Sequence, residues 1–180
     1  MKNIFLAAIC FFSAATAFSQ SETYYPKQRP ITQIDTLFPF DVALRRPDST
    51  DLVSSQIMKK GRVTVISFWL TTCYPCMIEF QEYAKNWETW KKEADFDFVA
   101  ISTDFPKNWP AFVAKKSAWP WPIVLDFNRE FGSFLPGRLN GLPQVFLYDQ
   151  KGELVYHHRK FSMGDEKLLF EEIKKLMPAK

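Results

Sequence analysis

A Cys-x-x-Cys sequence at the junction of a strand and a helix constrains this chain more than any other feature. The β-branched run Val63–Ile66 predicts a buried strand, and Phe68–Cys76 follows it, with cysteines at positions 73 and 76. Apolar residues then recur at alternating spacings of four and three, which predicts a long helix from about Pro75 to Glu93. A helix start offers unpaired N–H groups and a partial positive charge, and both favour thiolate over thiol. The motif therefore has the geometry of a redox pair.

The first residues have the pattern of a secretory signal peptide. A lysine near the start, an apolar run from Ile4 to Phe12 and small residues up to Ala17 follow one another. We expect residues 1–19 to be removed, residues 20–34 to form an N-terminal segment and residues 35–180 to form the folded domain. The apolar run is too short to span a bilayer as a stable helix, and no later run is long enough. We therefore expect a soluble, exported protein, periplasmic or otherwise outside the cytoplasm, without stable membrane insertion.

Charge and cysteine content narrow the function classes. The net charge of +3 is dispersed along the chain, and nothing in it suggests nucleic-acid binding. Of three cysteines, Cys10 would leave with the signal peptide, so the mature chain would keep only Cys73 and Cys76. An exported protein with both cysteines in one C-x-x-C does not use disulfides as a scaffold, and we expect a reversible disulfide. A structural disulfide or a metal site is the alternative, but a metal would need two further ligands and no Cys-His cluster exists.

Strands and helices alternate through the rest of the chain. We expect strands at 97–102, 123–125, 144–148 and 154–158, the last two forming a hairpin. Helices are expected at 108–116 and 165–177, with one helical turn at 129–134. Before the Cys-x-x-Cys motif, the sequence of residues 31–40 favours a strand or hairpin at the domain edge, and that of residues 51–60 favours one short helix. This order indicates an α/β domain with a mixed β-sheet and helices on both faces.

These features together resemble the thioredoxin superfamily. They are the strand with Phe68-Trp69-x-x-x-Cys73-x-Pro75-Cys76, the helix after it, and a Gly-x-Pro sequence ending at Pro143 before a β-hairpin. Three further features resemble the exported TlpA/ResA-like thiol–disulfide oxidoreductases of that superfamily. They are the signal peptide, the helix inserted around residues 109–116, and the spacing from Cys73 and Cys76 to Glu79. The resemblance implies a thioredoxin-like domain over residues 35–180, with an N-terminal extension and a central inserted helix.

The resemblance also implies a role for each residue of the motif. Cys73 would be the nucleophile, and Cys76 would resolve the mixed disulfide that Cys73 forms with a substrate. Glu79 lies on the face of Cys76 by its spacing and would influence proton transfer there, whereas a solvated helix position is the alternative. Pro143 would be cis and face the cysteines, so that the backbone of Leu142 pairs with a substrate strand.

Three more residues are assigned to the substrate-binding surface. Trp69 is expected to pack beneath the motif and limit water around the sulfurs, and Tyr74 and Pro75 lie between the two cysteines.

The buried aspartate that thioredoxin carries six residues before its first cysteine is Ser67 in this chain. Proton transfer to and from the two cysteines is therefore expected to depend on a group other than an aspartate at this position.

The expected function is an exported thiol–disulfide oxidoreductase that exchanges with protein thiols and disulfides and is reset by an unidentified redox partner, without a cofactor. A copper-delivery protein on the same fold is one alternative, although such members resemble Cys-x-x-x-Cys with a histidine. His157 and His158 are adjacent on a strand, face opposite sides and cannot easily share a metal. A non-catalytic binding module with a structural disulfide is the other alternative. A peroxidase is disfavoured because no Pro-x-x-x-Thr-x-x-Cys pattern precedes either cysteine.

Overall fold

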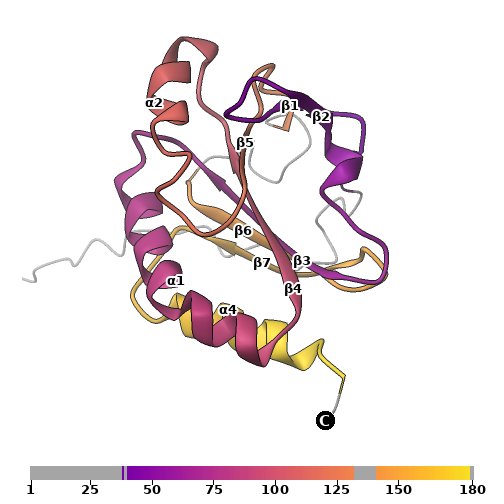
Figure 1. Cartoon of the computed structure of the whole chain (residues 1–180). Helices are drawn as coiled ribbons and strands as arrows, with labels where there is room; N and C mark the ends of the chain where they lie inside the picture. The colour runs from indigo at the N-terminus through magenta and orange to yellow at the C-terminus, as the bar shows by residue number, and fades with distance from the viewer. Residues whose placement is uncertain (1–37, 39, 132–140, 179–180) are drawn as a thin grey trace, which may run out of the picture.

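Figure 1 shows the computed structural model of the chain, in which residues 38, 40–131 and 141–178 are described. They form one seven-stranded sheet in the order β2-β1-β5-β4-β3-β6-β7. The strands are β1 (Ala43–Arg45), β2 (Asp51–Val53), β3 (Val63–Trp69), β4 (Phe96–Ser102), β5 (Ile123–Leu125), β6 (Gln144–Tyr148) and β7 (Leu154–Arg159). The helices are α1 (Tyr74–Glu93), α2 (Trp109–Val113) and α4 (Asp165–Lys175), with short 3-10 helices η2 (Ser54–Gln56) and η3 (Pro106–Asn108).

Strand β3 is an interior strand of the sheet, between β4 and β6, and is buried at every residue. It pairs in parallel with β4 and antiparallel with β6. A strand covered on both faces is typically a continuous apolar or β-branched run, which is what Val63–Trp69 supplies. The predicted α/β fold with a mixed sheet is confirmed.

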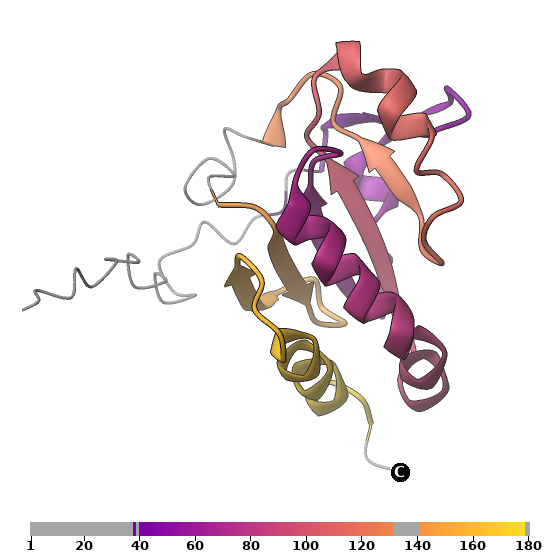
Figure 2. The ribbon, with the colours of Figure 1, turned by 90° about the vertical axis from the view of Figure 1, so that its left-hand side faces the viewer.

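The two faces of the sheet are covered differently. Helices α1, α2 and α4 contribute to one apolar cluster together with the side chains of Val63, Val65 and Trp69. In Figure 2 helix α1 crosses in front of the sheet, with α2 towards the top of the view and α4 towards the bottom. Ile66 and Phe68 of β3 point to the opposite face, which is covered by Phe38, by Val42 and by the segment through η2 to Ile57.

The predicted short helix at 51–60 is wrong for most of its length. Asp51–Val53 is strand β2, which pairs with β1, and only Ser54–Gln56 is helical. Leu52 is buried between two exposed neighbours, and the guanidinium of Arg45 binds the Asp51 carboxylate across the hairpin at 2.7 Å. Pairing with β1 therefore overrides the local preference for a helix.

The other boundaries differ less. Strands β5 and β6 have the predicted bounds, whereas α2 ends at Val113 and α4 at Lys175, each a few residues before the predicted end. The signal peptide, most of the expected strand at 31–40 and much of the turn at 129–134 lie outside the described residues. Within the part of the chain that the structure describes, none of the helices has the length and apolarity to cross a membrane.

Candidate active site

The two cysteines lie at the N-terminus of α1 and form a disulfide. Cys73 is the residue that caps the helix, and its Sγ accepts a hydrogen bond from the backbone N–H of Cys76 at 3.3 Å. Pro75 lies in the first turn, where a missing N–H breaks no helical hydrogen bond. Cys73 is half-buried, whereas Cys76 is fully buried. A molecule approaching the disulfide therefore reaches the sulfur of Cys73 first.

A buried carboxylate that the sequence analysis did not single out holds the loop before Cys73. Asp104 follows β4 and is 1% exposed. Its Oδ2 accepts hydrogen bonds from the Thr71 N–H at 2.8 Å and the Ser102 hydroxyl at 2.7 Å. Its Oδ1 accepts from the Thr71 hydroxyl at 2.8 Å and the Asn108 side-chain amide at 3.1 Å. One carboxylate thus ties the cysteine loop to the end of β4 and to η3.

Asp104→Ala is expected to destabilise the fold and loosen the cysteine loop. The change leaves the Thr71 N–H, the hydroxyls of Thr71 and Ser102 and the Asn108 amide without their acceptor, at a cost of about 3 kcal/mol in the free energy of unfolding. Chemical denaturation measures this loss. Thr71→Val is the matched control, since it removes one donor and keeps the backbone contact, and should cost about 1 kcal/mol. Equal stability of Asp104→Ala and the native protein would contradict the anchoring role.

Glu79 is buried against β3 rather than solvated. Its side chain has 0% exposure, which rules out the alternative of a solvated helix residue. Its Oε2 accepts a hydrogen bond from the hydroxyl of Ser67 at 3.1 Å, and its Oε1 accepts from the hydroxyl of Tyr83 at 3.0 Å. Burial raises the pKa of the Glu79 carboxyl to about 8, although both hydrogen bonds lower it in part. At neutral pH this carboxyl therefore carries a proton.

The two hydrogen-bond donors to Glu79, Tyr83 and Ser67, were not predicted, although the sequence position of each indicates a place near Glu79. Tyr83 lies one helical turn after Glu79 on the same face of α1, and burial raises its pKa well above the usual value, so it stays a donor. Ser67 occupies the position where thioredoxin has an aspartate. The carboxyl group beside this position is thus supplied by α1 instead of β3.

The residues assigned to substrate binding fall into two groups. Trp69 is fully buried beneath the motif, with its ring 5.5 Å from that of Phe80. It forms a wall of the site rather than its surface. Tyr74 is 74% exposed and Pro75 is exposed, so both border the approach to the disulfide. Contact between these two residues and a substrate stays a prediction.

Leu142 and Pro143 lie at the end of the sheet that carries the cysteine loop. The peptide bond between them is cis. Strand β6 begins directly after Pro143, and Gln144 is paired with Phe68 near the end of β3. Pro143 is buried and its carbonyl accepts the Lys160 N–H at 2.7 Å, whereas Leu142 is half-buried.

The two histidines point to opposite faces of β7, as their adjacency predicted. His157 is buried, with its Nε2 3.1 Å from the amide oxygen of Gln144, and burial lowers its pKa to about 4. His158 faces α4 and lies 2.9 Å from the carboxylate of Asp165. Among the described residues, no three side chains of His, Cys, Asp or Glu are grouped so that they could hold a metal ion.

Residues 38–157, more than half of the chain, match the AhpC/TSA family. The chain belongs to this family. Among curated proteins it is similar to the thiol-disulfide oxidoreductase ResA of Bacillus subtilis, 28% identical over 96 residues that cover 53% of this chain and 52% of that protein. The chain thus spans about half the length of this relative. The predicted resemblance to the TlpA/ResA-like members of the thioredoxin superfamily is confirmed.

Solved structures show the same fold. An uncharacterized thioredoxin-like protein from Porphyromonas gingivalis is 25% identical, with a TM-score of 0.65 over 75% of this chain and 88% of that chain. A putative protein disulfide isomerase from Bacteroides thetaiotaomicron is 23% identical, with a TM-score of 0.64 over 80% of this chain and 89% of that chain. At 23% identity, the similarity to the second structure is evidence for a shared fold alone.

Proposed function

We propose that this protein is an exported thiol–disulfide oxidoreductase that exchanges its Cys73–Cys76 pair with protein substrates. The observation that carries the proposal is the disulfide at the N-terminus of α1, with one half-buried and one fully buried sulfur. The similarity to ResA, named a thiol-disulfide oxidoreductase, supports the same activity. The signal-peptide pattern of residues 1–19 supports export.

In the reducing direction, the Cys73 thiolate attacks one sulfur of a substrate disulfide. The substrate S–S bond breaks, a mixed disulfide forms with Cys73, and the second substrate sulfur leaves as a thiolate that takes up a proton. The Cys76 thiolate then attacks the Cys73 sulfur, which restores the internal disulfide and releases the substrate sulfur that Cys73 had bound, also as a thiolate that takes up a proton. In the oxidising direction the same steps run in reverse. Either way, two electrons pass between the substrate and the cysteine pair, and a redox partner resets the pair.

The fold favours the Cys73 thiolate in two ways. The N–H of Cys76 points at the Cys73 sulfur, and the helix dipole of α1 places partial positive charge there. Both lower the thiol pKa and so raise the fraction of reactive thiolate. We propose that Glu79 exchanges a proton with the resolving thiol, since it lies one turn after Cys76, is buried with it, and has a pKa of about 8, close to that of an ordinary thiol.

We further propose that substrates lie along Tyr74, Pro75 and the Leu142 backbone. The register of β3 and β6 puts the start of β6 at the same sheet end as the cysteine loop, which supports this placement. An extended substrate segment could use backbone groups at Leu142 to align its sulfur with Cys73.

Trapping with a Cys76→Ser variant tests this function. The reduced variant keeps the nucleophile but lacks the resolving thiol, so the mixed disulfide with a model disulfide peptide should accumulate to near stoichiometry. Mass spectrometry of the alkylated mixture measures the adduct. The native protein treated in the same way is the control and should show little adduct. A Cys76→Ser protein that forms no adduct would refute the proposed roles.

A further inference from the structure

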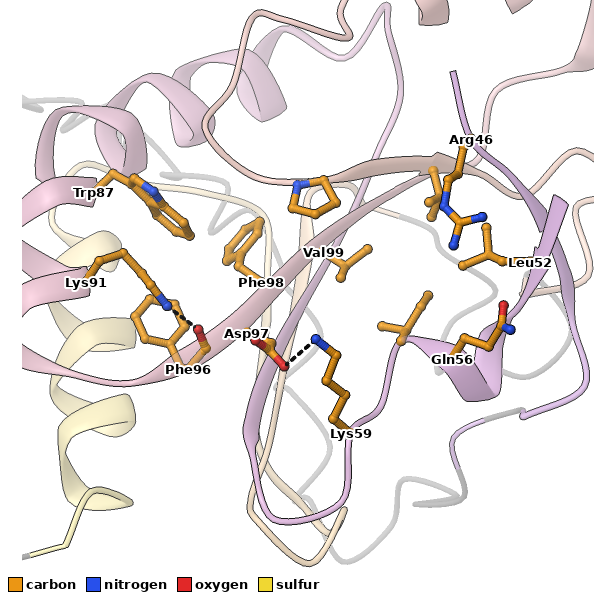
Figure 3. Close-up of a pocket in the computed structure, with 13 residues that line it drawn as sticks. Arg46, Leu52, Gln56, Lys59, Trp87, Lys91, Phe96, Asp97, Phe98 and Val99 are labelled. Atoms are coloured by element: carbon orange, nitrogen blue, oxygen red, sulfur yellow. Dashed lines mark hydrogen bonds and ion pairs between the residues drawn. The ribbon is translucent and has the colours of Figure 1, made fainter. Parts of the chain in front are cut away.

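Part of the edge of β4 carries no neighbouring strand. Strand β3 pairs with β4 along its whole length from Phe96 to Ser102, whereas β5 pairs only with Ala100–Ser102. On the β5 side, residues 96–99 therefore have no strand partner in the part of the chain that the structure describes. A groove of about 340 Å³ lies along this open edge, as Figure 3 shows. Phe96 pairs with Val63 at the start of β3, so the groove lies at the sheet end away from the cysteines.

The backbone of β4 directs hydrogen-bonding groups into this groove. The Ala100 N–H donates to the carbonyl of Pro122 at 3.0 Å, and the Ser102 carbonyl accepts from the Asp126 N–H at 2.8 Å. Backbone direction repeats every second residue along a strand, so the N–H and C=O of Phe98 point to this same side. The carbonyl of Phe96 points to this side as well, and it accepts a hydrogen bond from the ammonium group of Lys91. An open edge of this kind is a template for an added strand.

Apolar side chains form both walls of the groove. Trp87, Phe96 and Phe98 line it on the face of α1, and Leu52, Ile57 and Val99 line it on the opposite face. Successive side chains of an added strand point alternately to the two faces. They would therefore meet an apolar surface on either side.

The charges around the groove are mainly positive. Arg46, Lys59 and Lys91 line it, and the one carboxylate in its lining, Asp97, is bound by Arg62 at 3.0 Å and by Lys59 at 3.7 Å. A second hollow of about 240 Å³ shares Arg46, Pro122 and Val124 with the groove and adds Lys116 and Asp48. The two hollows adjoin through these shared residues, and their mainly positive lining is complementary to a chain with negative charges.

We propose that this groove binds an extended, acidic segment of a partner protein, which adds to the open edge of β4 as a strand. The inference goes beyond thiol–disulfide exchange and does not depend on it. Backbone bonds to Phe98 would give the segment its register, and Lys59 and Lys91 would select for acidic side chains. The cysteines stay accessible because they lie at the other end of the sheet.

A fluorescein-labelled peptide with a valine core and two consecutive glutamates at each end, so that glutamates face both sides, tests the proposal on the oxidised protein. We expect saturable binding in fluorescence polarisation, weakening with added salt because the contacts are partly ionic. Hydrogen exchange at the Phe98 amide should slow when the peptide is bound. Two control peptides should bind at least about tenfold more weakly: one with lysine in place of glutamate, and one with its alternate amides N-methylated.

Matched protein variants locate the binding site. Lys59→Glu combined with Lys91→Glu should weaken peptide binding about tenfold. Lys92→Glu combined with Lys167→Glu changes the same number of exposed charges outside the groove and should leave binding unchanged. Disulfide exchange should be unaffected in both double variants, so failure of the groove proposal and failure of the proposed function are distinguishable.

Several results would overturn the proposal. Equal binding of the N-methylated peptide would exclude strand addition, and equal binding of the lysine peptide would exclude acidic selection. Tighter binding by a peptide of this chain's own residues 24–37 would assign the groove to the N-terminal segment. A concentration-dependent dimer in sedimentation, with the Phe98 amide protected without peptide, would assign it to a second copy of this chain.

Discussion

Cys73→Ser is expected to reduce disulfide exchange by roughly 10³-fold or more, the scale on which the loss of a nucleophile is felt. A serine hydroxyl at this position has no thiolate form, and the remaining thiol of Cys76 is fully buried and cannot reach a protein disulfide. The measurement is the rate at which the reduced protein reduces a model disulfide peptide. The far-ultraviolet circular dichroism of the variant should match that of the native protein in its reduced state.

The paired variants make the assignment of roles testable. Cys73→Ser should neither turn over nor form an adduct, whereas Cys76→Ser should form an adduct without turnover. If Cys73→Ser formed the adduct and Cys76→Ser did not, the two sulfurs would have exchanged roles. The structure argues against this exchange because only Cys73 is partly accessible.

Glu79→Gln is expected to remove a large pH dependence from the stability of the fold. Burial raises the pKa of the Glu79 carboxyl from 4.5 to about 8. Between these two pH values the folded state keeps a proton that the unfolded state has already released. Because the unfolded state then binds fewer protons, the free energy of unfolding falls as the pH rises through this window. The total fall is on the order of 5 kcal/mol, and above the folded pKa the slope disappears. Glutamine stays neutral at every pH and should lack this slope.

Chemical denaturation from about pH 5 to about pH 8 measures the effect. The advantage of Glu79→Gln over the native protein should grow with pH across this range. Glu88→Gln, at an exposed position of the same helix, is the matched control and should follow the native curve. Parallel curves for native protein and Glu79→Gln would mean that the Glu79 pKa is not raised in the folded state.

The same variant should change the reactivity of the reduced cysteines. Above its pKa of about 8 Glu79 is ionised, and its charge then raises the pKa of a neighbouring thiol by like-charge repulsion. Glutamine removes that charge, so a thiol of the pair should ionise at lower pH in the variant. Rates of alkylation by iodoacetamide against pH measure this shift. Superimposable profiles would limit Glu79 to a structural role.

The sequence predicted the central elements because their signals are local. Val63–Trp69 is a run that suits a strand buried on both faces, and the spacing through α1 is the period of one helix face. Strands β1 and β2 were missed because three residues with one buried side chain hardly differ from a loop. Only the pairing of β1 with β2 on one side and with β5 on the other identifies them.

The site was predicted where the residues are neighbours in sequence, and less well where they meet across the sheet. Cys73, Cys76 and Glu79 share a helix start, so spacing alone relates them. Asp104 reaches Thr71 only because β3 and β4 are adjacent and parallel, which places both strand ends together. Its position directly after a buried strand was the available signal. The groove along β4 depends on where the shorter β5 pairs, and register is not readable from one sequence.

The exposure of Tyr74 has a consequence for how this protein can vary. Its side chain lies outside both apolar clusters and is 74% exposed, although it stands between the two reacting sulfurs. Substitutions at such a surface position usually change stability by no more than about 0.5 kcal/mol. The same substitutions alter the immediate surroundings of the disulfide, where 30 mV in reduction potential corresponds to about 1.4 kcal/mol. Natural drift or laboratory selection at this position can therefore retune redox behaviour while the fold stays the same.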